Sequence, residues 1–235
     1  MYARVWKRVL DVILSLAALV VLSPVLLMLI VVGMIVMGGN PFFTQIRPGK
    51  DEKLFRLVKF RSMSNRKGAD GKLLPDEKRL TGYGRFIRAT SLDELPELWN
   101  ILKGDMSIVG PRPQLVQDMV FMTPEQRRRH SVRQGLTGLA QCNGRNAISW
   151  EKKLEYDLCY IEHISFWGDV RILLKTAAGV FRREGITEEN MATAEDLGDH
   201  LLHRNVIDKA FYDAKQQEAE ALLRKFRNQE TLAEV

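Results

Sequence analysis

The sequence is poor in cysteine and histidine, with two and four residues respectively among 235. Cys142 and Cys159 show no spacing typical of a zinc site, and no other feature indicates an oxidising compartment. We therefore predict two reduced thiols and a cytosolic working side. His130 and His163 are interpreted as surface or packing residues rather than catalytic bases.

Signatures of nucleic-acid binding are also lacking, since there is no zinc-finger spacing, no glycine-aromatic RNA-binding motif and no convincing helix-turn-helix. The formal net charge is nevertheless +6. A phospholipid surface or a phosphorylated substrate fits this charge better than nucleic acid does. The length suits one sizeable domain with a tail, and no internal repeat is evident.

Long apolar runs are absent except at the N-terminus, where residues 9–37 are almost continuously apolar. The interruptions are Asp11, Ser15, Ser23, Pro24 and Gly33. A straight helix of this length would extend beyond the roughly 30 Å hydrocarbon core of a bilayer. A secretory signal peptide matches poorly, because the run is too long and no clear cleavage pattern follows it. A spanning helix or a re-entrant helix remains.

Two observations favour re-entry. Pro24 lies near the middle, where it breaks or bends a helix, and Ser23 can satisfy freed backbone groups. Basic residues usually mark the cytosolic side, and here both flanks are basic. They are Arg4, Lys7 and Arg8 before the run, and Arg47, Lys50, Lys53 and Arg56 after it. The alternative is a kinked spanning helix.

The rest of the chain predicts an α+β fold, mostly helical with short strands. Strands are expected at 42–47 and 53–63, joined by a turn. A polar glycine-containing loop follows, then a basic helix over 77–88 and a short amphipathic helix over 95–102. Residues 104–113 are expected to form a turn and an extended loop. Further helices are predicted at 124–132, 149–162 and 167–182.

The helix predicted over 167–182 has an apolar face that could lie on a membrane or pack into the core. From residue 194 the sequence becomes charged and rich in Ala, Gln and Glu, which predicts one or two solvated helices. We therefore divide the chain into an N-terminal membrane helix (1–38), a catalytic domain (39–190) and a C-terminal helical extension (191–235). The extension is predicted to be dispensable for chemistry and to serve self-association or packing against the domain.

The main chemical candidates are the adjacent carboxylates Asp93 and Glu94, which lie among basic residues. Arg85 and Arg88 precede them, and Lys103 and Arg112 follow. Such a pair can bind a metal and attack phosphorus, while arginines neutralise phosphate oxygens. Two local structures are compatible with the spacing. Ser91 and Glu94 could form a capping box, or Pro96 could be the first helical residue, leaving both acids ahead of the helix.

Two proline- or glycine-rich motifs are weaker candidates. Residues 110–113 (GPRP) form either a simple turn or a rigid support that presents Arg112. Residues 143–146 (NGRN) form either a tight turn or a phosphate or sugar contact. Neither motif is specific alone.

Together the motifs resemble the small monotopic phosphoglycosyl transferases of bacteria, the bacterial sugar transferase family. The matching stretches are 7–11, 23–24, 43–49, 59–63, 90–113 and 137–150, in the family's order, and the resemblance covers roughly residues 1–185. It is particularly close to members that start N-linked glycans in Campylobacter-type pathways. Gln134 stands where the family usually has proline, and Leu139 where tryptophan is frequent.

The resemblance implies a re-entrant helix broken at Ser23–Pro24, with Lys7 and Arg8 in its anchor, and a compact domain on the cytosolic face of the bacterial inner membrane. It also implies transfer of a phospho-sugar from a UDP-sugar to polyprenol phosphate, with release of UMP. Asp93 matches the nucleophile and a ligand of Mg²⁺, and Glu94 matches its partner. The matched substrate-binding residues are Lys59, Arg88, Gly110, Pro111, Arg112, Pro113, Arg145 and Asn146.

The physics of the reaction is consistent with this implication, because both donor and acceptor are anionic. A carboxylate nucleophile divides the reaction into two steps, and Mg²⁺ with arginines offsets charge in each. A homodimer and contacts with downstream glycosyltransferases are further expectations. The sugar is open: an N-acetylated sugar is our hypothesis, with galactose and glucose as alternatives. A non-catalytic scaffold binding anionic lipid or partner enzymes is the competing class, and a hydrolase is the competing enzyme.

Overall fold

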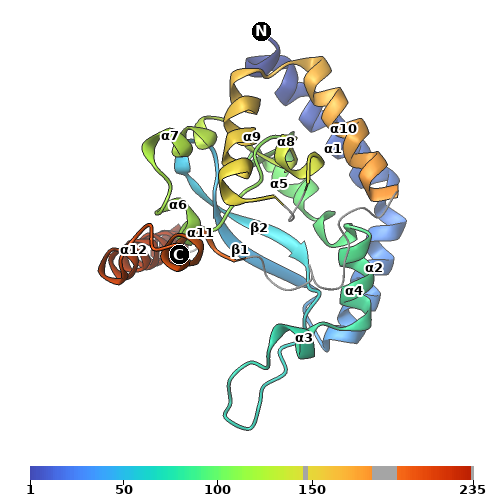
Figure 1. The fold of residues 1–235 in the computed structure, drawn as a ribbon. Helices are drawn as coiled ribbons and strands as arrows, with labels where there is room; N and C mark the ends of the chain where they lie inside the picture. The colour runs from blue at the N-terminus through green and yellow to red at the C-terminus, as the bar shows by residue number, and fades with distance from the viewer. Residues whose placement is uncertain (145–147, 182–194, 234–235) are drawn as a thin grey trace.

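The computed structural model describes residues 1–144, 148–181 and 195–233. Within them the fold is α+β and mostly helical, with two small sheets between the helices (Figure 1). Strands β1 (Phe42–Pro48) and β2 (Leu54–Phe60) pair antiparallel, with Phe42 opposite Phe60. A turn of the 3-10 type (Lys50–Glu52) joins them, so the predicted hairpin is confirmed. Alternation along β2 buries Phe55 and Leu57 on one face, and Phe60 at its end is buried on the other.

The N-terminal apolar run forms two helices instead of one. A short π-helix (Tyr2–Trp6) leads into α1 (Lys7–Val21), and α2 (Ser23–Met37) follows at an angle of 64°. The bend lies at the predicted position: Ser23 Oγ donates to the carbonyl of Val20 at 2.7 Å, and Pro24 occupies the first turn of α2. No single described helix is long and apolar enough to cross a membrane, whereas this bent pair passes by length and composition. Re-entry itself stays a prediction.

Polar side chains fasten α1 to the domain. Lys7 Nζ lies 2.6 Å from Asp169 Oδ2 on α10 (Phe166–Phe181). Arg8 donates to the carbonyls of Ile101 and Leu102 at 2.6 and 2.8 Å, at the end of α5 (Glu97–Lys103). These bonds satisfy carbonyls that a helix end leaves unpaired. Lys7 and Arg8 therefore attach α1 to the domain through these contacts.

The segment predicted as one helix over 77–88 forms two, and that prediction is wrong. Helix α3 (Asp76–Arg79) ends before α4 (Gly82–Ala89). Thr81 adopts an extended conformation between them, and its Oγ1 accepts from the amide of Gly84 at 2.9 Å. This cap starts a new helix. A Cβ at Gly84 would lie 1.9 Å from the carbonyl oxygen of Ser62, so the close approach of α4 requires glycine.

The capping-box interpretation of Ser91 is also wrong. Ser91 has a left-handed φ of 56°, and its side chain makes no capping bond. A single 3-10 turn (Leu92–Glu94) follows, and Pro96 directly precedes α5. The alternative is the correct one, since both acids lie ahead of that helix.

Part of the expected loop 104–113 is a strand. Strand β3 (Met106–Val109) pairs in parallel with β4 (Gln134–Thr137), and Met106 and Val109 are buried. A four-residue strand leaves little periodicity in the sequence, and its partner lies far along the chain. The prolines restrict only the loop that follows it.

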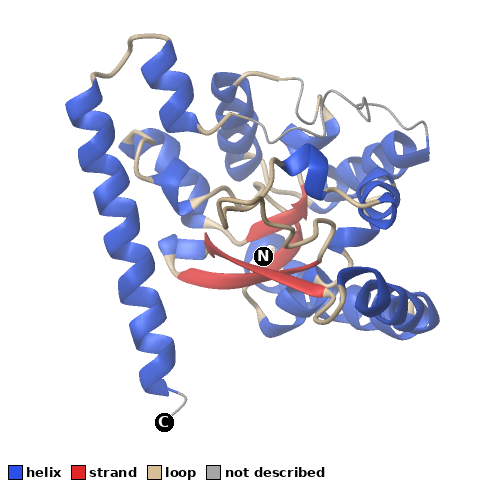
Figure 2. Cartoon of the chain, turned by 90° about the horizontal axis from the view of Figure 1, so that it is seen from below, coloured by secondary structure: helices blue, strands red, loops and turns tan. Residues whose placement is uncertain are grey.

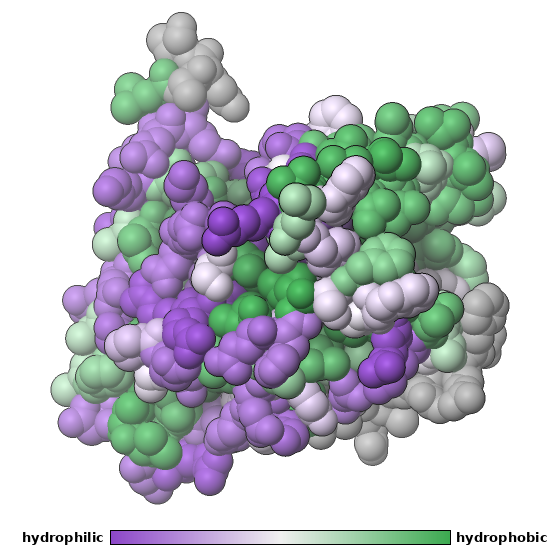
Figure 3. Space-filling model, turned by 90° about the horizontal axis from the view of Figure 1, so that it is seen from above, coloured by the Kyte–Doolittle hydropathy of each residue, from purple (hydrophilic) through white to green (hydrophobic). Residues whose placement is uncertain are grey.

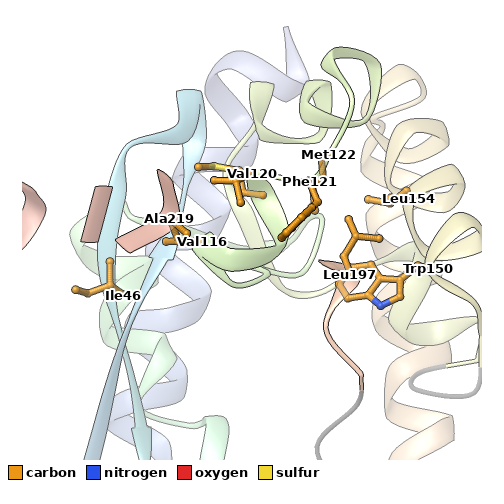
Figure 4. Close-up of a cluster of buried hydrophobic side chains, with 10 residues drawn as sticks. Ile46, Val116, Val120, Phe121, Met122, Trp150, Leu154, Leu197 and Ala219 are labelled. Atoms are coloured by element: carbon orange, nitrogen blue, oxygen red, sulfur yellow. The ribbon is translucent and has the colours of Figure 1, made fainter. Parts of the chain in front are cut away.

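Several of the remaining helices are close to the predictions, namely α7 (Pro124–Arg127) with a 3-10 turn (Arg128–Ser131), α9 (Trp150–Glu162), α11 (Leu197–His203) and α12 (Lys209–Ala233). The short helices α6 (Val116–Met119) and α8 (Leu139–Cys142) were not predicted. Helix α12 lies along one side of the domain, opposite the bent pair (Figure 2). One hydrophobic cluster joins Val116, Val120 and Phe121 to Leu197 and Ala219 of the extension (Figure 4). The extension therefore packs against the domain.

Candidate active site

Four parts of the chain bring the candidate side chains together. Lys59 comes from β2, Arg88 from α4, the two acids from the 3-10 turn before α5, and Arg112 from the loop after β3. Ionic contacts between residues of β2, the turn and the loop bring them into one cluster. The sequence placed these residues in separate motifs, and the fold unites them.

Glu94 is the centre of an ion-pair network. Its Oε1 lies 2.7 Å from Lys59 Nζ and 2.5 Å from Arg112 Nη2. Burial alone would raise the pKa of Glu94, but the charges and hydrogen bonds of Arg112 and Lys59 outweigh it and hold the pKa far below its usual range. Glu94 is therefore a fixed anion whose charge is already compensated by the protein.

Asp93 differs from its neighbour. Its half-buried carboxylate has no hydrogen-bond or ion-pair partner among the residues that the structure describes. Burial, and next the charge of Glu94, raise the pKa of Asp93 to about 6, against the opposing influence of Lys59, Arg112 and Arg88. Near pH 7 it is therefore mostly ionised, and its oxygens remain available to a ligand. Uncommitted and close to cations, it has the properties of a nucleophile.

Glu97 is a site residue that the sequence interpretation missed. It is buried at the start of α5, and its Oε1 lies 3.0 Å from Lys59 Nζ. Burial raises the pKa of Glu97 to about 7. Lys59 is thus shared by two carboxylates. The available signal was the three-residue spacing from Glu94, which places both acids on the same side of one turn.

The Gly110–Pro113 loop is held by its backbone. The amide of Gly110 donates to the carbonyl of Thr137, and the amide of Gly135 donates to the carbonyl of Pro111, each at 2.8 Å. A Cβ at Gly110 would lie 2.5 Å from the carbonyl oxygen of Arg133, so glycine permits this close approach. The rigid support interpreted from the sequence is present, and the side chain of Arg112 points from it to Glu94.

Arg88 is also near this cluster. Its Nε donates to Ser62 Oγ at 3.0 Å. Its charge partly opposes the rise in the pKa of Asp93 that burial and Glu94 cause. Arg145 and Asn146 lie outside the described residues. Lys7, Arg8, Ser23 and Pro24 belong to the bent helix pair and its attachments rather than to the cluster.

The donor set suits a metal that arrives with its substrate better than a resident one. No group of three His, Cys, Asp or Glu side chains able to hold a metal occurs in the part of the chain that the structure describes. Magnesium in phosphoryl-transfer sites often takes one or two carboxylates, with substrate phosphates and water as the other ligands. Asp93 supplies one uncommitted carboxylate, so the residues present fit Mg²⁺ bound together with a diphosphate.

An uncommitted carboxylate beside ion-paired cations, on a small α+β domain, is a suitable site for a phosphorylated substrate. Residues 2–183 match the bacterial sugar transferase family, and the chain belongs to it.

Three relatives show the range of this family. An uncharacterized sugar transferase, EpsL, of Bacillus subtilis is 49% identical over 189 residues, covering 80% of this chain and 94% of the relative. The UDP-glucose:undecaprenyl-phosphate glucose-1-phosphate transferase of Klebsiella pneumoniae is 40% identical, covering 73% of this chain. The undecaprenyl-phosphate galactose phosphotransferase of Salmonella typhimurium is 36% identical, covering 78% of it. The last two are longer, and the match spans 39% and 42% of their lengths.

Proposed function

We propose that the protein transfers a sugar 1-phosphate from a UDP-sugar to polyprenol phosphate, with release of UMP. The observation that carries this proposal is the contrast between the two acids: Glu94 is neutralised by Lys59 and Arg112, while Asp93 has no partner among the described residues. The relatives named as sugar-phosphate transferases on undecaprenyl phosphate support the reaction class.

Asp93 is the nucleophile in this proposal. An oxygen of its carboxylate forms a bond to the sugar-bearing phosphorus of the donor, and the bond from that phosphorus to the UMP oxygen breaks. A phosphate oxygen of the polyprenol phosphate then attacks the same phosphorus and releases Asp93. Arg112 and Arg88 bind phosphate oxygens, while Glu94 holds Arg112 and Lys59 in position. Bound at Asp93 with the diphosphate, Mg²⁺ supplies charge neutralisation and orientation.

In this proposal the enzyme acts at the cytosolic face of a membrane. The bent pair exposes large apolar side chains from both helices, among them Ile13, Val20, Leu27 and Ile35. An exposed apolar surface of this extent fits lipid better than water. With the break at Ser23–Pro24, we propose that the pair enters one leaflet and returns. Single cysteines at Ala3 and Lys50 should then be labelled from the same side, and labelling from opposite sides would instead indicate a spanning helix.

Intact-mass spectrometry tests the covalent step. Enzyme incubated with a UDP-sugar alone should release UMP and gain the mass of one phospho-sugar, and Asp93→Asn should do neither. Turnover by the parent enzyme without any adduct would favour direct transfer. A membrane scaffold without catalysis predicts no turnover and unchanged behaviour of Asp93→Asn.

A panel of UDP-sugars with one polyprenol phosphate identifies the donor. We propose an N-acetylated sugar, from the resemblance to initiating transferases of the Campylobacter type. Product that partitions into organic solvent indicates transfer to the lipid, and a water-soluble sugar phosphate indicates hydrolysis. UDP-glucose or UDP-galactose as the preferred donor would exclude the N-acetylated proposal.

A further inference from the structure

A buried ion pair lies directly behind the loop that carries Arg112. Arg129, in the 3-10 turn after α7, is fully buried, and Asp157 of α9 is 3% exposed. Arg129 Nε lies 2.9 Å and its Nη2 2.7 Å from Asp157 Oδ2. The same Nη2 donates to the backbone carbonyl of Arg112 at 2.5 Å. One guanidinium thus joins α9 to the residue that binds Glu94.

Helix α9 holds this segment at a second point. The hydroxyl of Tyr160, one turn after Asp157, lies 3.1 Å from the carbonyl oxygen of Val109 and 2.9 Å from Asp169 Oδ1, so the two acceptors share its single proton. Val109 is the last residue of β3, directly before the Gly110–Pro113 loop. The two ends of the segment 109–112 are therefore attached to adjacent turns of one helix. Such attachment fixes both the position and the direction of the Arg112 side chain.

Stability is a weak explanation for the pair. Removing two charges from water costs several kcal/mol per ion, so a buried pair often stabilises a fold no more than apolar residues of the same volume. Arginine suits the arrangement because its planar fork has donors for a carboxylate and a carbonyl together, whereas lysine is a point charge. The backbone carbonyl of Arg129 accepts a hydrogen bond from Gln134 Nε2 at 3.2 Å, which helps to hold the backbone of Arg129 in place.

We infer that Arg129 and Asp157 are positioning residues, which hold Arg112 where it binds the phosphate of the donor. This inference rests on the proposed function. Arg112 lies between Glu94 and solvent, with 39% of its side chain exposed, so a small displacement of its backbone moves the guanidinium relative to Asp93. A misplacement of about 1 Å at such a contact can reduce the rate by roughly a hundredfold.

A double-mutant cycle tests this role. Asp157→Asn keeps the shape of the side chain but removes the charge that orients Arg129, and we expect kcat/KM for the UDP-sugar to fall by about tenfold to a hundredfold. KM for the UDP-sugar should rise. Arg112→Ala keeps the backbone carbonyl that Arg129 binds and removes only the guanidinium. In that background Asp157→Asn should cost little more, because the group that it positions is gone. Single-turnover release of UMP allows the slow variants to be measured.

Leu154→Ala is the matched control. Leu154 lies on α9 one turn before Asp157 and is equally buried, but it belongs to the hydrophobic cluster. Its substitution should lower the melting temperature and leave KM unchanged. If Asp157→Asn does not fold, Arg129→Lys replaces it in the cycle, since lysine keeps the charge but loses the fork.

The outcomes separate the two proposals. A parent enzyme that turns over no UDP-sugar contradicts the proposed function. An active parent with full additivity in the cycle, or with no effect of Asp157→Asn on KM, overturns the positioning role and leaves the function standing. Near-complete loss of the Asp157 effect in Arg112→Ala supports it.

Discussion

The two ends of the chain are both long and helical, but they are attached to the domain in opposite ways. Helix α1 buries Asp11 and Ser15 and exposes aliphatic side chains such as Leu16 and Val20. Helix α12 buries Ala219 and packs Tyr212, Leu222, Leu223 and Phe226 against the domain, with charged residues outside. The space-filling view shows the difference, with hydrophobic surface on one side and hydrophilic surface on the side of α12 (Figure 3).

The different exposure of apolar residues in α1 and α12 suits different surroundings. A helix in water hides its apolar stripe, as α12 does. In α1 the polar residues are the buried ones, and Asp11 Oδ1 accepts from the amide of Ile108 at 2.9 Å. Ala18 and Leu19 near its end pack against the domain, while most of its other apolar residues face outward. This reversal is costly in water and favourable in lipid, and it supports the membrane proposal for the bent pair.

Removing the C-terminal extension should have the largest effect. A chain ending at Met191 uncovers Met119, Val120 and Phe121, which are buried beside Leu197 and Ala219. Each loses roughly 1.5–3 kcal/mol of burial, a large share of the 5–15 kcal/mol typical of a domain. We expect a steep fall in melting temperature, measured in detergent, although the chemistry of the folded fraction should persist.

A chain ending at Asn228 is the control, because it keeps Phe226 and the packed part of α12. If the longer deletion melts like the parent, the apolar attachment of α12 is unimportant. If it folds normally but cannot turn over substrate, the extension belongs to the active site.

The second largest effect should come from a charge placed on the outer side of the bent pair. Leu27 of α2 is 63% exposed, so Leu27→Asp removes no protein contact of note. In lipid the charge should cost about 2.5–3.5 kcal/mol. The membrane-bound fraction after cell lysis should fall. Ala221→Asp on the exposed side of α12 is the matched control and should change nothing. Equal recovery of both variants in the membrane would contradict burial of α2 in lipid.

The sequence predicted those features that depend on neighbouring residues. Pro24 indicated the break, the residues of 53–63 indicated β2, and Pro96 offered the alternative in which Asp93 and Glu94 lie before α5. The hairpin and most helices followed from such local patterns. The roles of Asp93 as nucleophile and Arg112 as phosphate ligand come from the family motifs and stay predictions.

Features that depend on distant contacts were missed. The strand β3 exists because β4 pairs with it, and the division between α3 and α4 depends on Thr81 and the contact of Gly84 with Ser62. Glu97 was not singled out from the sequence, and its burial beside Lys59 makes it part of the site. Lys7 and Arg8 were interpreted as the basic cytosolic flank of the membrane anchor, and their partners far along the chain were not foreseen.

A smaller effect is expected from the polar attachment of α1. Asp11→Ala leaves the amide of Ile108, a partly buried residue, without its acceptor. A fully buried unsatisfied donor costs about 1–3 kcal/mol, so the loss here should lie near the lower end of this range. Thermal unfolding in nanodiscs should show a lower midpoint. Ile13→Ala on the outer side of the same helix is the control. The membrane proposal surrounds Ile13 with lipid, so the midpoint should stay near that of the parent. A larger loss for Ile13→Ala would mean that α1 is attached by apolar contacts like α12.

The smallest effect should come from an ionic contact between α12 and β2. Glu230 accepts two hydrogen bonds from Arg56 Nε, at 2.7 and 2.9 Å, and one from its Nη2 at 2.6 Å. The geometry is bidentate, but the side chains of Arg56 and Glu230 are 47% and 29% exposed. Water and salt screen such a pair, so Glu230→Gln should change the free energy of unfolding by less than about 1 kcal/mol.

The corresponding change at the other end of the chain is Asp169→Asn. The side chains of Lys7 and Asp169 are 12% and 6% exposed, so this variant should cost distinctly more, because it leaves a buried cation without its counter-charge. Denaturant titrations of both variants at low and high salt provide the measurement. A Glu230→Gln variant as damaged as Asp169→Asn would show that α12 is held by charge after all, and the contrast between the two ends of the chain would fail.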